Sequence, residues 1–121
     1  MDEHELLRVA AALARPFVPN ADCSSATVAA ALLTREGNVY TGVCIDLRCG
    51  LGWCAERSAA AEMLKARETK IAVVVAVHST GKIVPPCGAC REFLLQLNEE
   101  NAETWVVLGE GHGRALKELL P

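Results

Sequence analysis

The sequence feature that most restricts the fold is an unbroken apolar run, Ile71-Ala72-Val73-Val74-Val75-Ala76-Val77. β-Branched residues make up most of this run, which favours a strand. A strand with no polar alternation is typical of a sheet that is buried on both faces. We therefore expect helices on both sides of the sheet, in a layered α/β arrangement.

Helical and strand-like segments alternate along the rest of the chain. The helical spacing of Leu6, Ala10 and Leu13 predicts an amphipathic first helix, which two prolines end. In order, the patterns predict helix Glu3–Arg15, strands Ala26–Leu33 and Val39–Asp46 joined by a turn, helix Trp53–Glu68, strand Ile71–Val77, helix Gly88–Glu100, strand Trp105–Leu108 and a terminal helical turn at Arg114–Leu120. The glycine-rich stretch 109–113 is expected to be a loop. This order predicts one domain over residues 1–121, with a mixed sheet between helices.

Charge and composition exclude several classes of function. The 121 residues carry a formal net charge of −3, so neither a nucleic acid nor an anionic membrane is an expected partner. No apolar run approaches the roughly 18 residues of a spanning helix, and the acidic start, Met1–Glu5, does not resemble a signal peptide. We therefore expect a cytoplasmic protein, whose six cysteines would be free thiols or metal ligands.

Two cysteine-containing segments carry the chemistry, and each lies where a loop enters a predicted helix. They are Trp53–Arg57 and Pro85–Arg91. A helix N-terminus lowers the pKa of a thiol, because its N–H groups are unpaired and its dipole end is positive. Three thiolates there could bind one zinc ion per chain and leave a fourth position open, as in catalytic zinc sites. The candidate ligands are Cys54, Cys87 and Cys90. Glu56 would place a carboxylate beside the metal.

Two arginines, Arg57 and Arg91, follow these segments closely. Three thiolates on Zn²⁺ leave a net negative charge, and hydrogen bonds from guanidinium groups to the sulfurs would offset it. The alternative is that both arginines lie on a solvated helix face. The whole set also has a structural alternative, in which the cysteines are free buried thiols and Glu56 is a surface residue. A third interpretation is a thiol oxidoreductase that uses Cys87 and Cys90.

The spacing of the two segments is more specific than a lone Cys-x-x-Cys pair. The motif Cys54-Ala55-Glu56, a strand, and then Pro86-Cys87-Gly88-Ala89-Cys90 match the signature of zinc deaminases, whose glutamate moves protons and does not bind the metal. On these two motifs the chain resembles the cytidine deaminase family, in particular its small three-cysteine branch. The resemblance implies zinc on the three cysteines and proton transfer by Glu56. It also implies a three-layer α/β/α sandwich around a five-stranded mixed sheet, and a homotetramer in which neighbouring loops help to close each pocket.

The chain departs from that family where the substrate would lie. The family's first strand carries a phenylalanine near the position of Ala26, and its second strand ends in Asn-x-Glu, which binds the ribose hydroxyls. The corresponding residues here are Cys44-Ile45-Asp46, and a thiol cannot replace the hydrogen bonds of an amide. These departures predict an altered substrate preference, with weak turnover of cytidine relative to another aminopyrimidine.

The sequence therefore predicts a zinc-dependent hydrolytic deaminase of an aminopyrimidine nucleoside or a related small molecule. The alternatives are a substrate of the blasticidin-S type or another amino-heterocycle, and a zinc-binding module that has lost catalysis. The candidate substrate-binding residues are Cys44, Asp46, Trp53 and Ala55. Trp53 could instead pack in the core. The cysteines outside the ligand set are expected to be free thiols rather than further ligands: Cys23, Cys44 and Cys49.

Overall fold

A single mixed sheet organises the chain in the computed structural model, which describes residues 1–121. Its longest strand is β2 (Cys23–Thr34), which pairs antiparallel with β3 (Val39–Leu47) on one side and with β4 (Ile71–His78) on the other. β5 (Trp105–Gly109) runs parallel to β4, and β6 (His112–Ala115) returns antiparallel to β5. The one parallel pair is the one that a helix connects, as parallel pairing requires.

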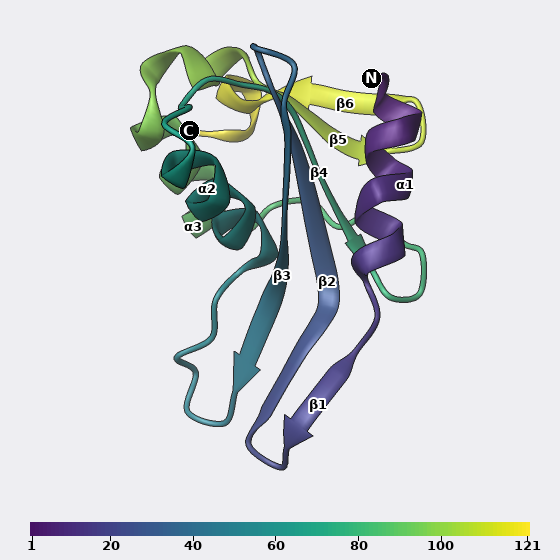
Figure 1. The fold of residues 1–121 in the computed structure, drawn as a ribbon. Helices are drawn as coiled ribbons and strands as arrows, with labels where there is room; N and C mark the ends of the chain where they lie inside the picture. The colour runs from purple at the N-terminus through teal and green to yellow at the C-terminus, as the bar shows by residue number, and fades with distance from the viewer.

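Helices cover both faces of this sheet, as Figure 1 shows. α1 (Glu3–Leu13) packs on one face, while α2 (Ala55–Lys65) and α3 (Gly88–Leu97) lie on the other. Two clusters of buried apolar side chains lie between the layers, and β4 contributes to both. Ile71, Val74, Val75 and Val77 of that strand are at most 2% exposed. The predicted three-layer α/β/α sandwich is confirmed, and so is the buried strand at its centre.

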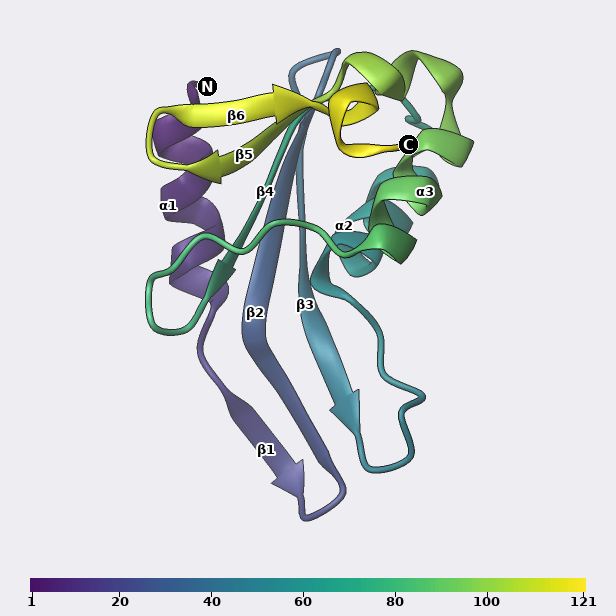
Figure 2. The same ribbon diagram turned by 180° about the vertical axis from the view of Figure 1, so that it is seen from behind.

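The strand β2 bends sharply, and the bend separates the body of the molecule from an extension. The pairing register shifts between Ser25 and Ala29, and Ala26 adopts a positive φ of 63°, which costs a residue with a Cβ about 1–2 kcal/mol. Beyond this bulge, the short strand β1 (Phe17–Asn20) pairs with the start of β2. Figure 2 shows β1 and the adjoining ends of β2 and β3 extending away from the helices.

Several element boundaries differ from those predicted. The segment 109–115 is neither a loop nor a helical turn: it contains the β5–β6 hairpin, and the chain then ends in a short 3-10 helix, η2 (Leu116–Leu119). The sequence pattern does not predict this hairpin, because what the hairpin needs at Gly113 is the absence of a side chain. A Cβ there would lie 2.6 Å from the Trp105 ring. β1 was also not predicted, so the sheet has six strands, and the helix predicted to reach Glu100 ends at Leu97.

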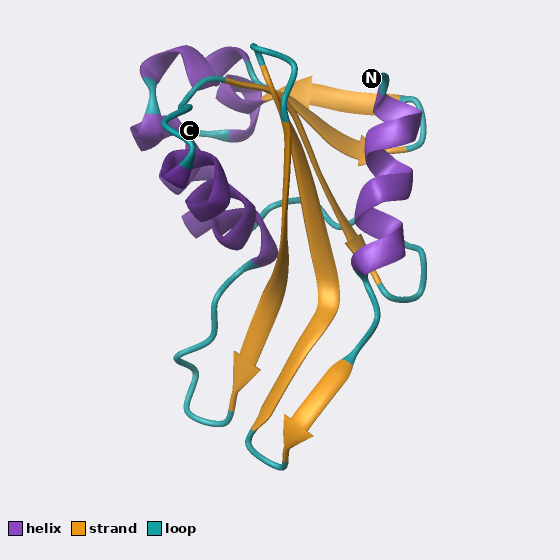
Figure 3. Ribbon diagram, viewed as in Figure 1, coloured by secondary structure: helices purple, strands orange, loops and turns teal.

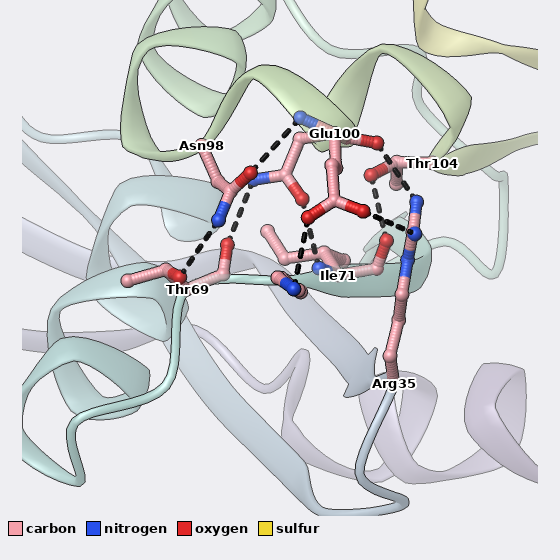
Figure 4. A network of polar contacts seen from close by, with 8 residues as sticks. Arg35, Thr69, Ile71, Asn98, Glu100 and Thr104 are labelled. Carbon is pink, nitrogen blue, oxygen red and sulfur yellow. Dashed lines mark hydrogen bonds and ion pairs between the residues drawn. The ribbon is translucent and has the colours of Figure 1, made fainter.

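Side-chain hydrogen bonds fix the junction between α3, the 3-10 helix η1 (Glu99–Glu103) and the start of β4, as seen in Figure 4. Asn101 Oδ1 accepts from the N–H of Ile71 at 2.9 Å, and Thr104 Oγ1 donates to the carbonyl of Ile71 at 2.8 Å. Asn101 Nδ2 also donates to the carbonyl of Leu94 at 3.0 Å. Because Asn101 is fully buried, these bonds tie α3 to the central strand of the core.

A second polar cluster joins the segment after α2 to the β2–β3 hairpin. Glu68 Oε2 accepts from Asn38 Nδ2 at 2.9 Å and from the hydroxyl of Tyr40 at 2.5 Å. The pKa of Glu68 lies below its ordinary value because Thr34, Tyr40 and Asn38 stabilise the charged form. The pKa of Tyr40 is raised from 10.0 to about 12, because its hydroxyl is hydrogen-bonded to Glu68 and because burial and nearby carboxylates act in the same direction.

Candidate active site

Three cysteine sulfurs converge where two helices begin side by side. Cys54 is the N-cap residue of α2 and Cys87 is the N-cap residue of α3, both with extended backbone angles. Cys90 lies in the first turn of α3 and is fully buried. The three Sγ atoms all lie within 4.8 Å of one another, and those of Cys54 and Cys87 are 3.9 Å apart. The structure therefore brings together the three residues that the sequence identifies as ligands.

The geometry and chemistry of this set fit zinc. A Zn–S bond of about 2.3 Å in a tetrahedral site separates the sulfurs by about 3.8 Å. The distance of 3.9 Å between the Sγ atoms of Cys54 and Cys87 matches that spacing. Thiolates also suit zinc better than magnesium or calcium, which prefer oxygen ligands. Three ligands leave one position of a tetrahedral site open, which is the arrangement of catalytic zinc.

The thiols of this cluster differ in their tendency to ionise. Burial raises the pKa of Cys54 and of Cys90 above the ordinary value for a thiol. Desolvation acts in the same direction on Cys87, but hydrogen bonds from Cys90, Cys54 and the backbone of Ala89 together outweigh it and lower that pKa. Cys87 is also the most exposed of the three. Cys87 is therefore the thiol of this cluster that ionises most readily.

Glu56 lies in the first turn of α2, two residues after Cys54. It is only 6% exposed, and no salt-bridge partner accompanies its carboxylate. Burial raises the pKa of Glu56, although its own backbone N–H and the charge of Arg57 act in the opposite direction. A buried carboxyl group with a raised pKa holds a proton more readily than an exposed one, so it can both accept and return a proton, as an acid–base catalyst must.

A cavity of about 510 Å³ opens beside these residues. Glu56, Cys54 and Cys87 line it, together with all four of the candidate substrate-binding residues: Cys44, Asp46, Trp53 and Ala55. Their role in binding stays a prediction. No lysine, arginine or histidine lines the cavity, whereas the carboxylates of Asp46 and Glu56 do. The cavity is therefore acidic, which disfavours a ligand that carries a phosphate group.

Cys44 on β3 lies outside the three-cysteine cluster, and its thiol is engaged within the cavity wall. The N–H of Val28 donates to Sγ at 3.3 Å, and the thiol donates to Asp46 Oδ2 at 3.5 Å. Burial raises the pKa of Cys44, so the thiol stays protonated. The thiol thus aligns the carboxylate of Asp46 and has little capacity left for a ligand. None of the six cysteines forms a disulfide.

The two arginines take different positions. The guanidinium carbon of Arg57 lies 5.1 Å from the ring centre of Trp53 and 5.5 Å from that of Phe93, so two aromatic rings hold it by cation–π contacts. Its buried Nε has no hydrogen-bond partner. Arg91 Nε and Nη1 instead donate to two backbone carbonyls, those of Pro86 and Leu119, both at 3.0 Å. Neither arginine lies on a fully solvated helix face. A bond from either to a sulfur stays a prediction.

Sequence reasoning missed part of the cavity wall. Thr27 and Val28 reach the cavity from the bulge in β2, and Val84 and Pro85 reach it from the loop before α3. The second pair directly precedes the Pro-Cys motif and could have been inferred from that position. The first pair depends on the positive φ of Ala26, for which the sequence contains no glycine or asparagine as a signal.

The loop between β3 and α2, drawn in teal in Figure 3, brings the ligand Cys54 back beside β3. Trp53 and Ile45 exchange two backbone hydrogen bonds, of 2.8 and 2.9 Å, which form an isolated bridge across the loop. The side chain of Trp53 is 41% exposed, so it lines the cavity rather than packing in the core.

None of the helices has the length and apolar character needed to span a membrane.

An open-sided three-thiolate zinc site with a buried glutamate next to it defines a class, the zinc-dependent hydrolytic deaminases that act on cyclic amidines. Comparison with known proteins agrees. Residues 1–107 match the family model of the cytidine and deoxycytidylate deaminase zinc-binding region, and the chain belongs to this family.

Individual relatives cover most of the chain. The cytidine deaminase of Halalkalibacterium halodurans is 37% identical over 99 residues, which are 78% of this chain and 74% of that protein. The crystal structure of cytidine deaminase from Mycobacterium tuberculosis matches with a TM-score of 0.83 at 28% identity, covering 100% of this chain and 95% of that one. The cytidine deaminase from Burkholderia pseudomallei matches at 0.78 and 32% identity, with 100% and 98% covered. The predicted family, fold and zinc chemistry are confirmed.

Proposed function

We propose that this protein deaminates an unphosphorylated, cytidine-type aminopyrimidine nucleoside and releases ammonia. The observation that carries the proposal is the buried carboxylate of Glu56 beside three converging thiols, on the wall of a cavity. The similar proteins named as cytidine deaminases support the choice of substrate class. The lack of any cationic side chain around the cavity supports a nucleoside over a nucleotide.

Glu56 performs the proton transfers of this reaction. Cys54, Cys87 and Cys90 would hold zinc, and the bound ion would supply the Lewis-acid chemistry that lowers the pKa of a water molecule and makes it a nucleophile near neutral pH. Glu56 accepts the first proton as the water oxygen attacks the amino-bearing ring carbon, and it delivers this proton to the adjacent ring nitrogen. It then transfers the second proton of the water to the amino group. The C–N bond breaks, ammonia leaves, and a carbonyl remains on the ring.

The decisive experiment is Glu56→Gln in the zinc-loaded protein. The variant should retain zinc and the fold, while turnover falls by about 10²–10⁴-fold because the general base is lost. Glu62→Gln is the matched control, since Glu62 lies on the same helix but is exposed, and it should keep normal turnover. A Glu56→Gln variant with more than about a tenth of the activity would remove Glu56 from this mechanism.

A substrate panel tests the chemical class. Ammonia release would be followed with cytidine, deoxycytidine, cytosine, deoxycytidylate and blasticidin S. We expect the best substrate to lack a phosphate and deoxycytidylate to be at least about tenfold poorer, a difference of about 1.4 kcal/mol. Deoxycytidylate as the best substrate would contradict the argument from cavity charge. No turnover of any compound by zinc-loaded protein would favour a binding module that has lost catalysis.

We also propose that the chain assembles into a homotetramer. The proposed location is the cytoplasm. Large apolar side chains on β1 and the loop before α2 support association, because Phe17, Val18 and Leu51 are 62%, 64% and 76% exposed. The six free cysteines support a reducing compartment. Light scattering after size exclusion should give about four times the chain mass of 12.9 kDa. An active species with the mass of one chain would contradict the tetramer.

A further inference from the structure

Arg91 lies in the first turn of α3, directly after the ligand Cys90. The positive end of the helix dipole, taken alone, disfavours a cation at this place. Its side chain is nevertheless half-buried and ordered by two hydrogen bonds to backbone carbonyls, those of Pro86 and Leu119. A position of this kind indicates that the guanidinium group has a specific task rather than a general surface role.

The first carbonyl belongs to the loop that carries a zinc ligand. The carbonyl of Pro86 is part of the peptide group that enters Cys87, and Pro86 itself is buried. Neither Pro85 nor Pro86 has an N–H, so this part of the loop has no backbone donor with which to hold itself. The bond from Arg91 Nε, at 3.0 Å, therefore fixes the orientation of the peptide that precedes the ligand.

The second carbonyl belongs to a segment far along the chain. Leu119 ends η2, and the same helix begins at Leu116, which is fully buried and whose N–H donates to the carbonyl of Thr104 at 2.8 Å. Figure 2 shows the C-terminal end lying beside α3. One end of η2 is thus anchored in the core, and the other end is held by Arg91.

We propose that Arg91 is a positioning residue that braces the Cys87 loop against the segment Leu116–Leu119, and thereby sets how tightly zinc is held. The planar guanidinium group is suited to this task, because it can bond two carbonyls at fixed angles at once. A lysine would carry the same charge but would not reproduce that fork. The inference requires the zinc site, but it is independent of which substrate is deaminated.

The test follows zinc rather than turnover, in the full-length zinc-loaded protein. Zinc release to the chromogenic chelator 4-(2-pyridylazo)resorcinol would be timed for wild type, Arg91→Gln and Arg91→Lys. Removal of such a supporting contact typically costs 10–100-fold in metal affinity, so we expect Arg91→Gln to release zinc about ten times faster. Arg91→Lys should release zinc more slowly than Arg91→Gln but still faster than wild type. The thiolate charge-transfer bands of the cobalt-substituted protein should shift in both variants, since they report ligand geometry.

Arg114→Gln is the matched control, because Arg114 contacts the same segment through Glu118, at 3.9 Å, and is 54% exposed. It should leave zinc release and the cobalt spectrum unchanged. Kinetically, a displaced ligand should lower kcat with little change in KM. Wild-type zinc release and an unchanged cobalt spectrum in Arg91→Gln would overturn the proposal. Full restoration by Arg91→Lys would also overturn it, since charge alone would then suffice. If Arg91→Gln does not fold, the lysine variant decides.

Discussion

The contact between α2 and β3 at Gly42 should control both the stability and the activity of the protein. A Cβ added at Gly42 would lie 2.3 Å from the backbone nitrogen of Ala59 and 2.6 Å from Cβ of Ser58. Ordinary van der Waals contact begins near 3.4 Å, so Gly42→Ala requires α2 and β3 to separate by about 1 Å. The nearest atom is backbone, so rotation of a side chain cannot relieve the clash.

The cost follows from that displacement. Overpacking of this kind costs about 1–3 kcal/mol, and the absence of any side-chain escape places Gly42→Ala near the upper end. The separation would also stretch the hydrogen bond from Ser58 Oγ to the carbonyl of Val43, now 2.9 Å, which contributes about 1 kcal/mol. A total of about 3 kcal/mol corresponds to a fall in Tm of roughly 10 °C for a chain of this size.

The same displacement should reach the active site. α2 begins at Ala55, so a movement of this helix carries Cys54 and Glu56 with it. A misplacement of about 1 Å can cost on the order of 10²-fold in rate, and we expect a loss of that order in kcat/KM for Gly42→Ala. Retained zinc would be measured in the same samples, because Cys54 moves relative to the other two ligands.

Calorimetry and steady-state kinetics on zinc-loaded protein check this prediction. Gly109→Ala is the matched control, since a Cβ there would meet only Cβ of His112, at 3.9 Å, and should change stability by less than about 0.5 kcal/mol. If Gly42→Ala melts within about 2 °C of wild type and keeps normal kcat/KM, the reasoning from the α2–β3 contact is refuted.

Three further predictions concern metal, pH and substrate. Elemental analysis should find about one zinc per chain, and removal by a chelator should abolish turnover; a folded, metal-free and active protein would contradict this. The pKa of Tyr40 is raised to about 12, so its contribution to the free energy of unfolding is complete below pH 10 and is lost as pH rises through 12. The pKa of Glu68 is lowered, so its contribution to the same free energy is lost at acid pH. Urea midpoints should therefore fall less steeply above pH 10 for Tyr40→Phe than for wild type, and equal slopes would count against the cluster. Cys44→Asn should raise kcat/KM for cytidine relative to cytosine by about five- to tenfold, the worth of one neutral hydrogen bond, and an unchanged ratio would dissociate Cys44 from sugar recognition.

The sequence alone determined the class of fold and the chemistry of the site. The apolar run in β4 requires cover on both faces, and that requirement holds wherever the strand lies. The Cys-Ala-Glu and Pro-Cys-x-x-Cys motifs are similarly local, because each places its thiols at the start of one helix. Short-range patterns of this kind depend on neighbours in the chain, so they can be read from residue order.

Only the tertiary structure decided which groups meet. The 3.9 Å between the sulfurs of Cys54 and Cys87 depends on how α2 and α3 pack, and the partners of Arg91 lie five and 28 residues away along the chain. The β5–β6 hairpin depends on Gly113 leaving room for Trp105, and the bulge in β2 depends on a strained Ala26. Contacts between distant residues depend on the free energy of the whole packed arrangement rather than on local propensity. No local pattern in the sequence therefore predicts them.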